Sequence, residues 1–197
     1  MSTHPDLDST AATVADLLDG IGDDQLDNPT PCEDMTVGRL LDHVMGLTLA
    51  FRAAARKDFS EFGDQVPTSD ATNLDAAWRQ ELPRRLEAMA AAWSEPSAWD
   101  GETKAGGITL PAQVMGLVAL NELVIHGWDL ARSTGQDFAP DDAAAASSVG
   151  LLSQDAPSRA EEGNGAFGRV IAVPDEASTL DRAVGLAGRD PAWKPAA

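Results

Sequence analysis

The sequence predicts an all-α protein, a four-helix bundle with a small C-terminal appendage. Apolar residues recur three and four positions apart in four long segments, and alanine is abundant. Aromatic residues make up only 5% of the chain, which has no tyrosine. This composition favours helices that pack closely through small side chains. At 197 residues, the chain suits one structural domain with a proper core.

The first two helices are predicted on either side of an irregular segment. Helical spacing of apolar residues predicts a first helix over 8–20. Residues 23–35 are rich in Pro, Asp and Asn, so we expect a loop there. Thr36 is a suitable N-cap for a second helix over 37–57, whose apolar residues form one inward face.

The next two helices complete the predicted bundle. The third is expected over 72–94, where Pro83 either kinks the helix or marks a displaced start. Residues 95–109 are expected to form a loop. Pro111 is well placed to open the fourth helix, and Gly135 to end it in a left-handed cap.

The remaining residues differ in character from the bundle. We assign residues 1–135 to the bundle and 136–197 to an appendage packed on it, within one structural domain. The appendage is expected to contain a helix over 141–154, a short extended element over 165–174 and a final helix over 177–188.

The fourth helix carries polar residues on a face that should point inward. With 3.6 residues per turn, Glu122, His126 and Asp129 lie within a narrow angular sector. The same stripe continues backwards through two apolar residues, Val118 and Met115. Burying a carboxylate and an imidazole is costly unless each is paired or bound to a metal ion.

A third donor is available from the second helix. If the second and fourth helices are neighbours, His43 converges with Glu122 and His126. Two histidines and one carboxylate are a recurrent ligand set for zinc or another divalent ion. Asp129 is then expected as a hydrogen-bond partner of a ligand or as a further ligand. Spacing alone leaves open a simpler alternative, in which hydrogen bonds satisfy the histidines; the remaining one, His4, is expected in a frayed tail.

Two motifs together resemble the DinB-like superfamily: TPCEDMTVGRLLDHVMG (30–46) and NELVIHGWDLARSTG (121–135). The resemblance is closer to its actinobacterial branch, which includes mycothiol-dependent maleylpyruvate isomerase. In that family the first motif ends in a metal-binding histidine, matched here by His43. The second motif supplies a glutamate and a histidine four residues apart, matched by Glu122 and His126.

The resemblance implies a bundle that holds a divalent metal, usually Zn²⁺ with Ni²⁺ as an alternative, and a low-molecular-weight thiol as cosubstrate. It therefore implies a thiol-dependent transferase or isomerase acting on a small molecule. A non-catalytic metal-binding or small-ligand-binding module, or a metal-dependent hydrolase, is the alternative. The sequence departs from the family at Met35, where tryptophan is common. The family's substrate-binding arginine has no clear counterpart among Arg159, Arg169 and Arg182.

Charge and targeting features narrow the expected partners. The net charge of −18 leaves no cationic footprint for nucleic acid and disfavours anionic membranes. The polar, acidic N-terminus predicts no secretory signal, and the lack of a long apolar run predicts no membrane span. Cysteine usage predicts a cytoplasmic protein, and the sequence leaves open whether it is a monomer or a homodimer. The single cysteine, Cys32, excludes an intrachain disulfide; we interpret it as structural or incidental rather than as a nucleophile.

Overall fold

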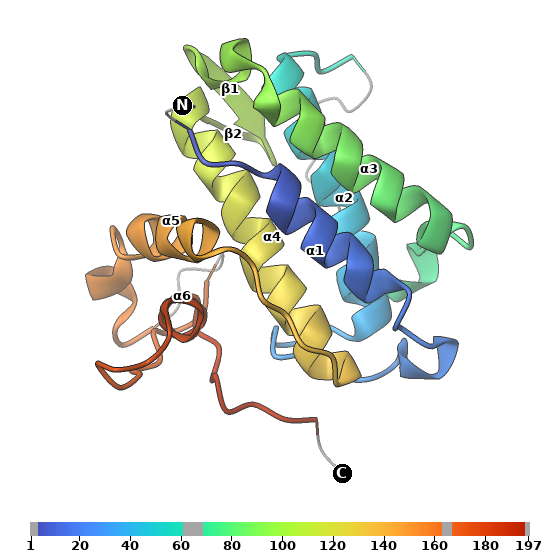
Figure 1. Ribbon diagram of the computed structural model, residues 1–197, viewed down its shortest axis with the longest axis vertical. Coiled ribbons are helices and arrows are strands. Elements are labelled where there is room, and N and C mark those ends of the chain that lie inside the picture. Colours follow the sequence, from blue (N-terminus) through green and yellow to red (C-terminus); the bar gives the residue numbers. More distant parts are fainter. Residues whose placement is uncertain (1–3, 61–68, 163–166, 196–197) are drawn as a thin grey trace.

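Four helices form the bundle in the computed structural model, which describes residues 4–60, 69–162 and 167–195. They are α1 (Asp8–Leu18), α2 (Val37–Arg56), α3 (Trp78–Ser94) and α4 (Ala112–Thr134). Helices α1 and α2 each pack against both α3 and α4, so the consecutive helices α1 and α2 lie diagonally across the bundle (Figure 1). The predicted fold class is confirmed.

Capping residues set the bounds of the long helices. The Thr36 hydroxyl accepts a hydrogen bond from the backbone N–H of Arg39 at 3.3 Å and opens α2. Gly135 ends α4 in the left-handed region, with φ of 73°. Both caps agree with the sequence prediction. Helix α3 begins six residues later than predicted, at Trp78, and Pro83 lies inside it, so Pro83 does not mark its start.

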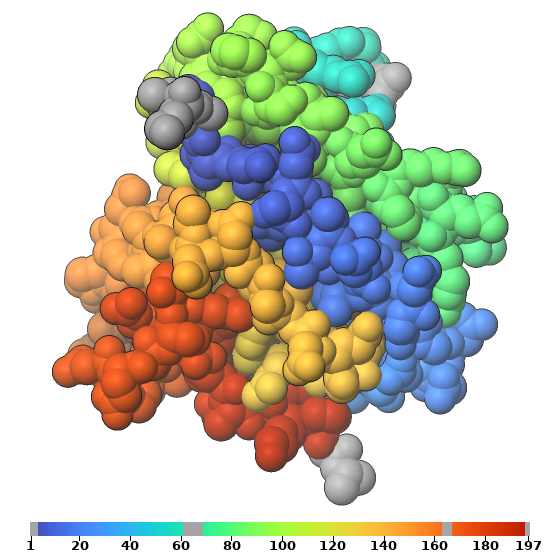
Figure 2. Space-filling view, in the orientation of Figure 1, coloured from blue at the N-terminus to red at the C-terminus, as the bar shows by residue number. Residues whose placement is uncertain are grey.

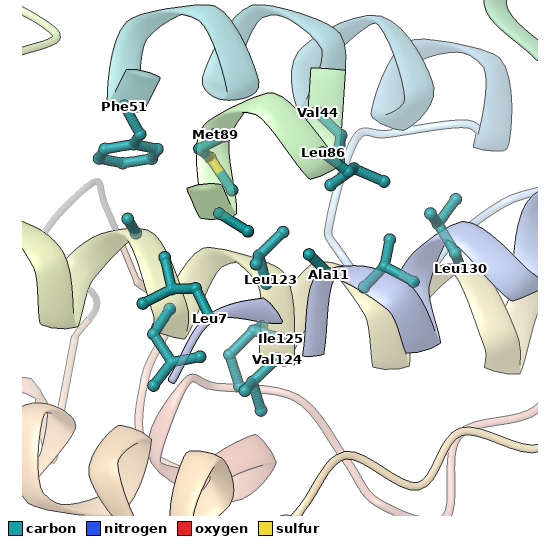
Figure 3. Packing of buried hydrophobic residues seen from close by; sticks show 14 of the residues in the cluster. Leu7, Ala11, Val44, Phe51, Leu86, Met89, Leu123, Val124, Ile125 and Leu130 are labelled. Atoms are coloured by element: carbon teal, nitrogen blue, oxygen red, sulfur yellow. The ribbon is translucent and has the colours of Figure 1, made fainter. Parts of the chain in front are cut away.

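Large apolar side chains fill the bundle. Those of α2, α3 and α4 meet at its centre, among them Val44, Met89 and Leu123 (Figure 3). Val124 and Ile125 lie on the other side of α4 and are also buried, so this stretch of α4 is buried on two sides. This helix is long and apolar enough to cross a membrane by composition, but 78% of the relevant window is buried, as in a core helix.

Two further helices form the appendage. Helix α5 (Asp142–Leu152) packs on α4, and α6 (Thr179–Leu186) packs on α5, so that the C-terminal segments cover one side of the bundle (Figures 1 and 2). Both lie within the helices predicted from the sequence. Four short 3₁₀ turns complete the helical structure of the described residues: Asp23–Gln25, Ala71–Asn73, Pro96–Trp99 and Ala156–Arg159.

Three local predictions are wrong. The expected loop over 95–109 contains a 3₁₀ turn and the first strand of an antiparallel hairpin, β1 (Glu102–Ala105) and β2 (Ile108–Pro111). Its two-residue turn uses Gly106 and Gly107, both with positive φ, as a hairpin of this length requires.

The expected extended element over 165–174 forms no strand in its described part, 167–174, because its backbone has no neighbouring strand to pair with. Residues 165 and 166 lie outside the described residues. His4 is not frayed, since its ring stacks on Trp99 at a centroid distance of 4.4 Å.

Candidate metal centre

Helix α4 places three polar side chains in one row, as the helical phase predicted. His126 lies between the two carboxylates: its Nε2 is 3.0 Å from Glu122 Oε2, and its Nδ1 is 3.0 Å from Asp129 Oδ2. Asp129 is fully buried and His126 is nearly so, whereas the Glu122 side chain keeps 19% of its surface exposed. The row therefore runs from the protein surface at Glu122 into the interior at Asp129.

Helix α2 brings the third predicted donor to the same place. His43 Nε2 lies 4.0 Å from Glu122 Oε2, and the two imidazole rings are perpendicular with centroids 5.1 Å apart. The His43 side chain is 24% exposed, so this end of the row reaches solvent. The convergence expected if α2 and α4 are neighbours is present in the structure.

These three side chains suit a divalent ion. One donor atom from each of His43, Glu122 and His126 lies within 4.8 Å of the other two. Two ligand atoms about 2.0 Å from a tetrahedral ion are about 3.3 Å apart, a value bracketed by the 3.0 and 4.0 Å separations of Glu122 from His126 and His43. Two imidazole nitrogens and one carboxylate oxygen are also a donor set that zinc and nickel accept.

Two further residues at this site escaped the sequence reasoning. Cys32, in the loop before α2, forms with His126 and Asp129 a second group whose potential donor atoms lie within 4.8 Å of one another. Arg189, beyond α6, donates hydrogen bonds to both carboxylate oxygens of Asp129, at 3.2 and 3.4 Å. Neither residue belongs to a periodic pattern, so only the tertiary fold reveals its place.

The charges of the site are balanced within it. Burial disfavours an ionised His126, but the hydrogen bonds that its ring donates to Asp129 and Glu122 outweigh burial and raise the pKa of His126 to about 9. Burial would raise the pKa of Glu122, yet the hydrogen bond and charge of His126 lower it below its ordinary value. Without a metal ion, an imidazolium therefore lies between two carboxylates.

The other two titratable side chains are held neutral. Burial, and then the charge of His126, lowers the pKa of His43 to about 4, so this imidazole is available as a donor at neutral pH. Burial raises the pKa of the Cys32 thiol to about 11. Cys32 is thus a thiol and not a thiolate near pH 7, in agreement with the expectation that it is no nucleophile.

A narrow cavity of about 10 Å³ adjoins the site inside the bundle. Glu122 and His126 form its polar end, and the rest of its wall is apolar, including Phe51 and Met89. A volume of this size is enough for about one water molecule. Larger molecules must therefore approach from the exposed side of His43 and Glu122.

The fold and the site together define a class, helical bundles with a candidate metal centre between two neighbouring helices. Within that class, the chain belongs to the family described as mycothiol maleylpyruvate isomerase N-terminal domain, which matches residues 7–131. The match covers the bundle with His43, Glu122 and His126, and it ends before the appendage that carries Arg189.

Comparison with similar proteins establishes the fold of this chain but not its activity. Uncharacterized proteins from two strains of Mycobacterium tuberculosis are each 29% identical over 133 residues, which is 62% of this chain and 62% of theirs. The chain thus matches less than two thirds of the length of these relatives.

The crystal structure of the mycothiol-dependent maleylpyruvate isomerase has a TM-score of 0.57 and 18% identity, over 78% of this chain and 70% of that chain. A histidine-to-alanine mutant of that enzyme is 17% identical, with the same TM-score and coverage. At this identity, the likeness establishes the shared fold alone.

Proposed function

We propose that the protein binds one divalent metal ion, Zn²⁺ with Ni²⁺ as the alternative, through His43, Glu122 and His126. The observation that carries this proposal is the convergence of three matched donor atoms from two helices far apart in the sequence. Asp129 supports it, because metal-binding histidines commonly give their second ring N–H to a carboxylate.

We further propose that the site serves a thiol-dependent transferase or isomerase acting on a small molecule. When bound, a divalent cation lowers the pKa of a coordinated thiol, so that thiolate, the nucleophile, is present at neutral pH. Family membership supports a low-molecular-weight thiol of the mycothiol type as the cosubstrate. The exposed edges of His43 and Glu122 give such a thiol access to the site.

The charges of the surrounding residues also favour an anionic partner. A divalent ion beside neutral His43 and His126 would share the site with one positive charge on Arg189 and two negative charges on Glu122 and Asp129. The site would then carry one net positive charge. A single thiolate or hydroxide would neutralise it, so the same charge balance also suits the alternative, a metal-dependent hydrolase.

Metal analysis of the purified protein tests the metal proposal. We expect about one equivalent of divalent metal in the wild type and its loss in His43→Ala and in His126→Ala. His4→Ala is the matched control, because His4 stacks on Trp99 away from the site and its removal should leave the metal content unchanged. A folded wild type that carries no metal and takes up none on dialysis against zinc would contradict the proposal.

Assays of thiol conjugation to a panel of small electrophiles test the enzyme proposal separately. We expect turnover with a mycothiol-type thiol that requires the metal and disappears in His126→Ala. Full metal occupancy without turnover would leave a non-catalytic binding module. Ester or amide hydrolysis that needs no thiol would instead favour the hydrolase.

A further inference from the structure

Arg189 reaches the metal centre because of the way α6 ends. The N–H of Gly188 bonds to Gly185 O at 3.0 Å, and that of Arg189 bonds to Val184 O at 3.0 Å. This is the hydrogen-bond pattern of a Schellman cap, which needs a left-handed residue at Gly188, where φ is 84°. A side chain there would also meet the backbone of Gly168, with a Cβ to Cα distance of 2.7 Å. The turn therefore directs the chain at Arg189 back towards α4.

Asp129 is shared between Arg189 and His126. Its Oδ2 lies 3.2 Å from Arg189 Nη2 and 3.0 Å from His126 Nδ1. The carboxylate is fully buried, and Arg189 is only 8% exposed. Since a carboxylate can only accept, His126 donates its Nδ1 proton to Asp129, which leaves Nε2 as the nitrogen that faces Glu122.

The Nδ1 side of His126 would otherwise be a rival metal site. Cys32, His126 and Asp129 lie close enough to supply sulfur, nitrogen and oxygen to one ion. Zinc accepts all three donors. In the folded protein, however, the Arg189 guanidinium already occupies the cation position beside Asp129. A divalent ion on this side would be repelled by Arg189 or would have to displace it from a buried ion pair.

We propose that Arg189 is a positioning residue that directs the metal ion to the Nε2 side of His126 and keeps it away from Cys32. The inference rests on the proposed metal site and adds a selection between its two neighbouring donor groups. Arg189 acts through Asp129, whose orientation it fixes, and it does not itself bind the metal ion. The appendage, which lies outside the family match, is thereby part of the metal centre.

Nitrogen NMR of zinc-loaded wild type tests the selection without any substitution in the site. We expect the His126 signals of a metal-bound Nε2 and a protonated Nδ1. Zinc on Nδ1 would overturn the inference while leaving metal binding intact. A wild type that binds no zinc would instead refute the proposed function, so the two failures are distinct.

Cobalt substitution tests the role of Arg189 itself. In Arg189→Met we expect a new thiolate-to-cobalt charge-transfer band in the near ultraviolet, as the ion gains Cys32 as a ligand. The band should be absent from wild type and from the double variant Arg189→Met with Cys32→Ser. Arg189→Lys keeps the positive charge and should retain the wild-type spectrum, whereas Arg182→Met controls for loss of an arginine elsewhere in the appendage.

A cobalt spectrum of Arg189→Met identical to that of wild type would overturn the inference. If Arg189→Met does not fold, the nitrogen assignment in wild type together with the Arg189→Lys spectrum still decides it. A sulfur band in the lysine variant would show that charge beside Asp129 does not direct the ion.

Discussion

The bundle and the appendage are held together by different kinds of side chain. The bundle buries large apolar residues from all four helices, such as Leu40, Leu86 and Trp93. Helices α5 and α6 mostly bury small ones, among them Ala144 and Ala183. Among the described residues of the appendage, the largest fully buried side chain is a charged one, Arg159.

Arg159 acts as the centre of the appendage. Its guanidinium donates hydrogen bonds to the backbone carbonyls of Leu152, Gly168 and Leu186, so it joins the ends of α5 and α6 to the segment between them. Asp155 balances its charge at 2.9 Å. A small helical layer with few large apolar residues can thus be held together by a buried arginine that bonds to backbone carbonyls. In the bundle, buried leucine side chains hold the helices together instead.

The largest loss of stability is expected when Arg159, the buried arginine of the appendage, is replaced. We predict that Arg159→Met, which keeps an unbranched apolar stem, lowers the free energy of unfolding by about 3–5 kcal/mol. The buried carbonyl of Leu152 and the half-buried one of Leu186 lose their donor, at roughly 1–3 kcal/mol each, whereas the exposed Gly168 can bond to water instead. Urea denaturation followed by circular dichroism measures the change.

Arg169→Met is the control, because the hydrogen bond that Arg169 donates to Ala160 O lies at the exposed surface. Its cost should stay below about 1 kcal/mol. Equal stabilities of Arg159→Met and wild type would mean that the small apolar surfaces hold the appendage without help.

The second prediction concerns the reactivity of Cys32, which lies close to side chains of both the bundle and the appendage. Burial, with Asp129 and Glu122, outweighs the charge of Arg189 and raises the thiol pKa to about 11. Thiolate is the reactive form, so at about pH 8 metal-free protein should react with iodoacetamide about 200-fold more slowly than a thiol of pKa about 8.5. The rate should rise nearly tenfold per pH unit between about pH 7 and 10.

Urea-unfolded protein provides the reference for Cys32, since its thiol then has an ordinary pKa. A rate in the folded protein that levels off near pH 8.5 would show that the charge of Arg189 offsets the effect of burial on the thiol pKa.

The smallest effect is expected in the bundle. Leu86 is fully buried, and Leu86→Met conserves volume, so we predict a loss of less than about 1.5 kcal/mol in the free energy of unfolding. Leu86→Ala, which leaves a cavity, should cost about 2–5 kcal/mol in the same urea experiment. A large loss in the free energy of unfolding for Leu86→Met would contradict the contrast with Arg159, because methionine would then destabilise both regions.

The sequence predicts those parts of the fold that local patterns determine. Thr36 and Gly135 mark the ends of helices with strong periodic faces, and the structure has both caps. The hairpin escaped because its strands have only four residues each, although Gly106–Gly107 is a recognisable turn signal. The paired backbone at Val170 and Ile171 uses Arg159 O and Gly185 O, contacts that no local pattern encodes.

The candidate site shows the same division. Helical phase placed Glu122, His126 and Asp129 on one face of one helix, and the apolar stripe of α2 indicated where His43 would lie. Arg189 comes from a third region of the chain, and its direction depends on a glycine turn that brings Gly188 against Gly168. Such a contact depends on tertiary packing, so periodicity carries no information about it.

The diagonal placement of α1 and α2 has a consequence for the order of assembly. The contact between α2 and α4 joins segments that are far apart along the chain, and Arg189 adds a still later segment. Contacts of this range form slowly, after local helices exist. If a metal ion binds as proposed, its ligands come together only late in folding, and the ion would reach them from the exposed edge at His43 and Glu122.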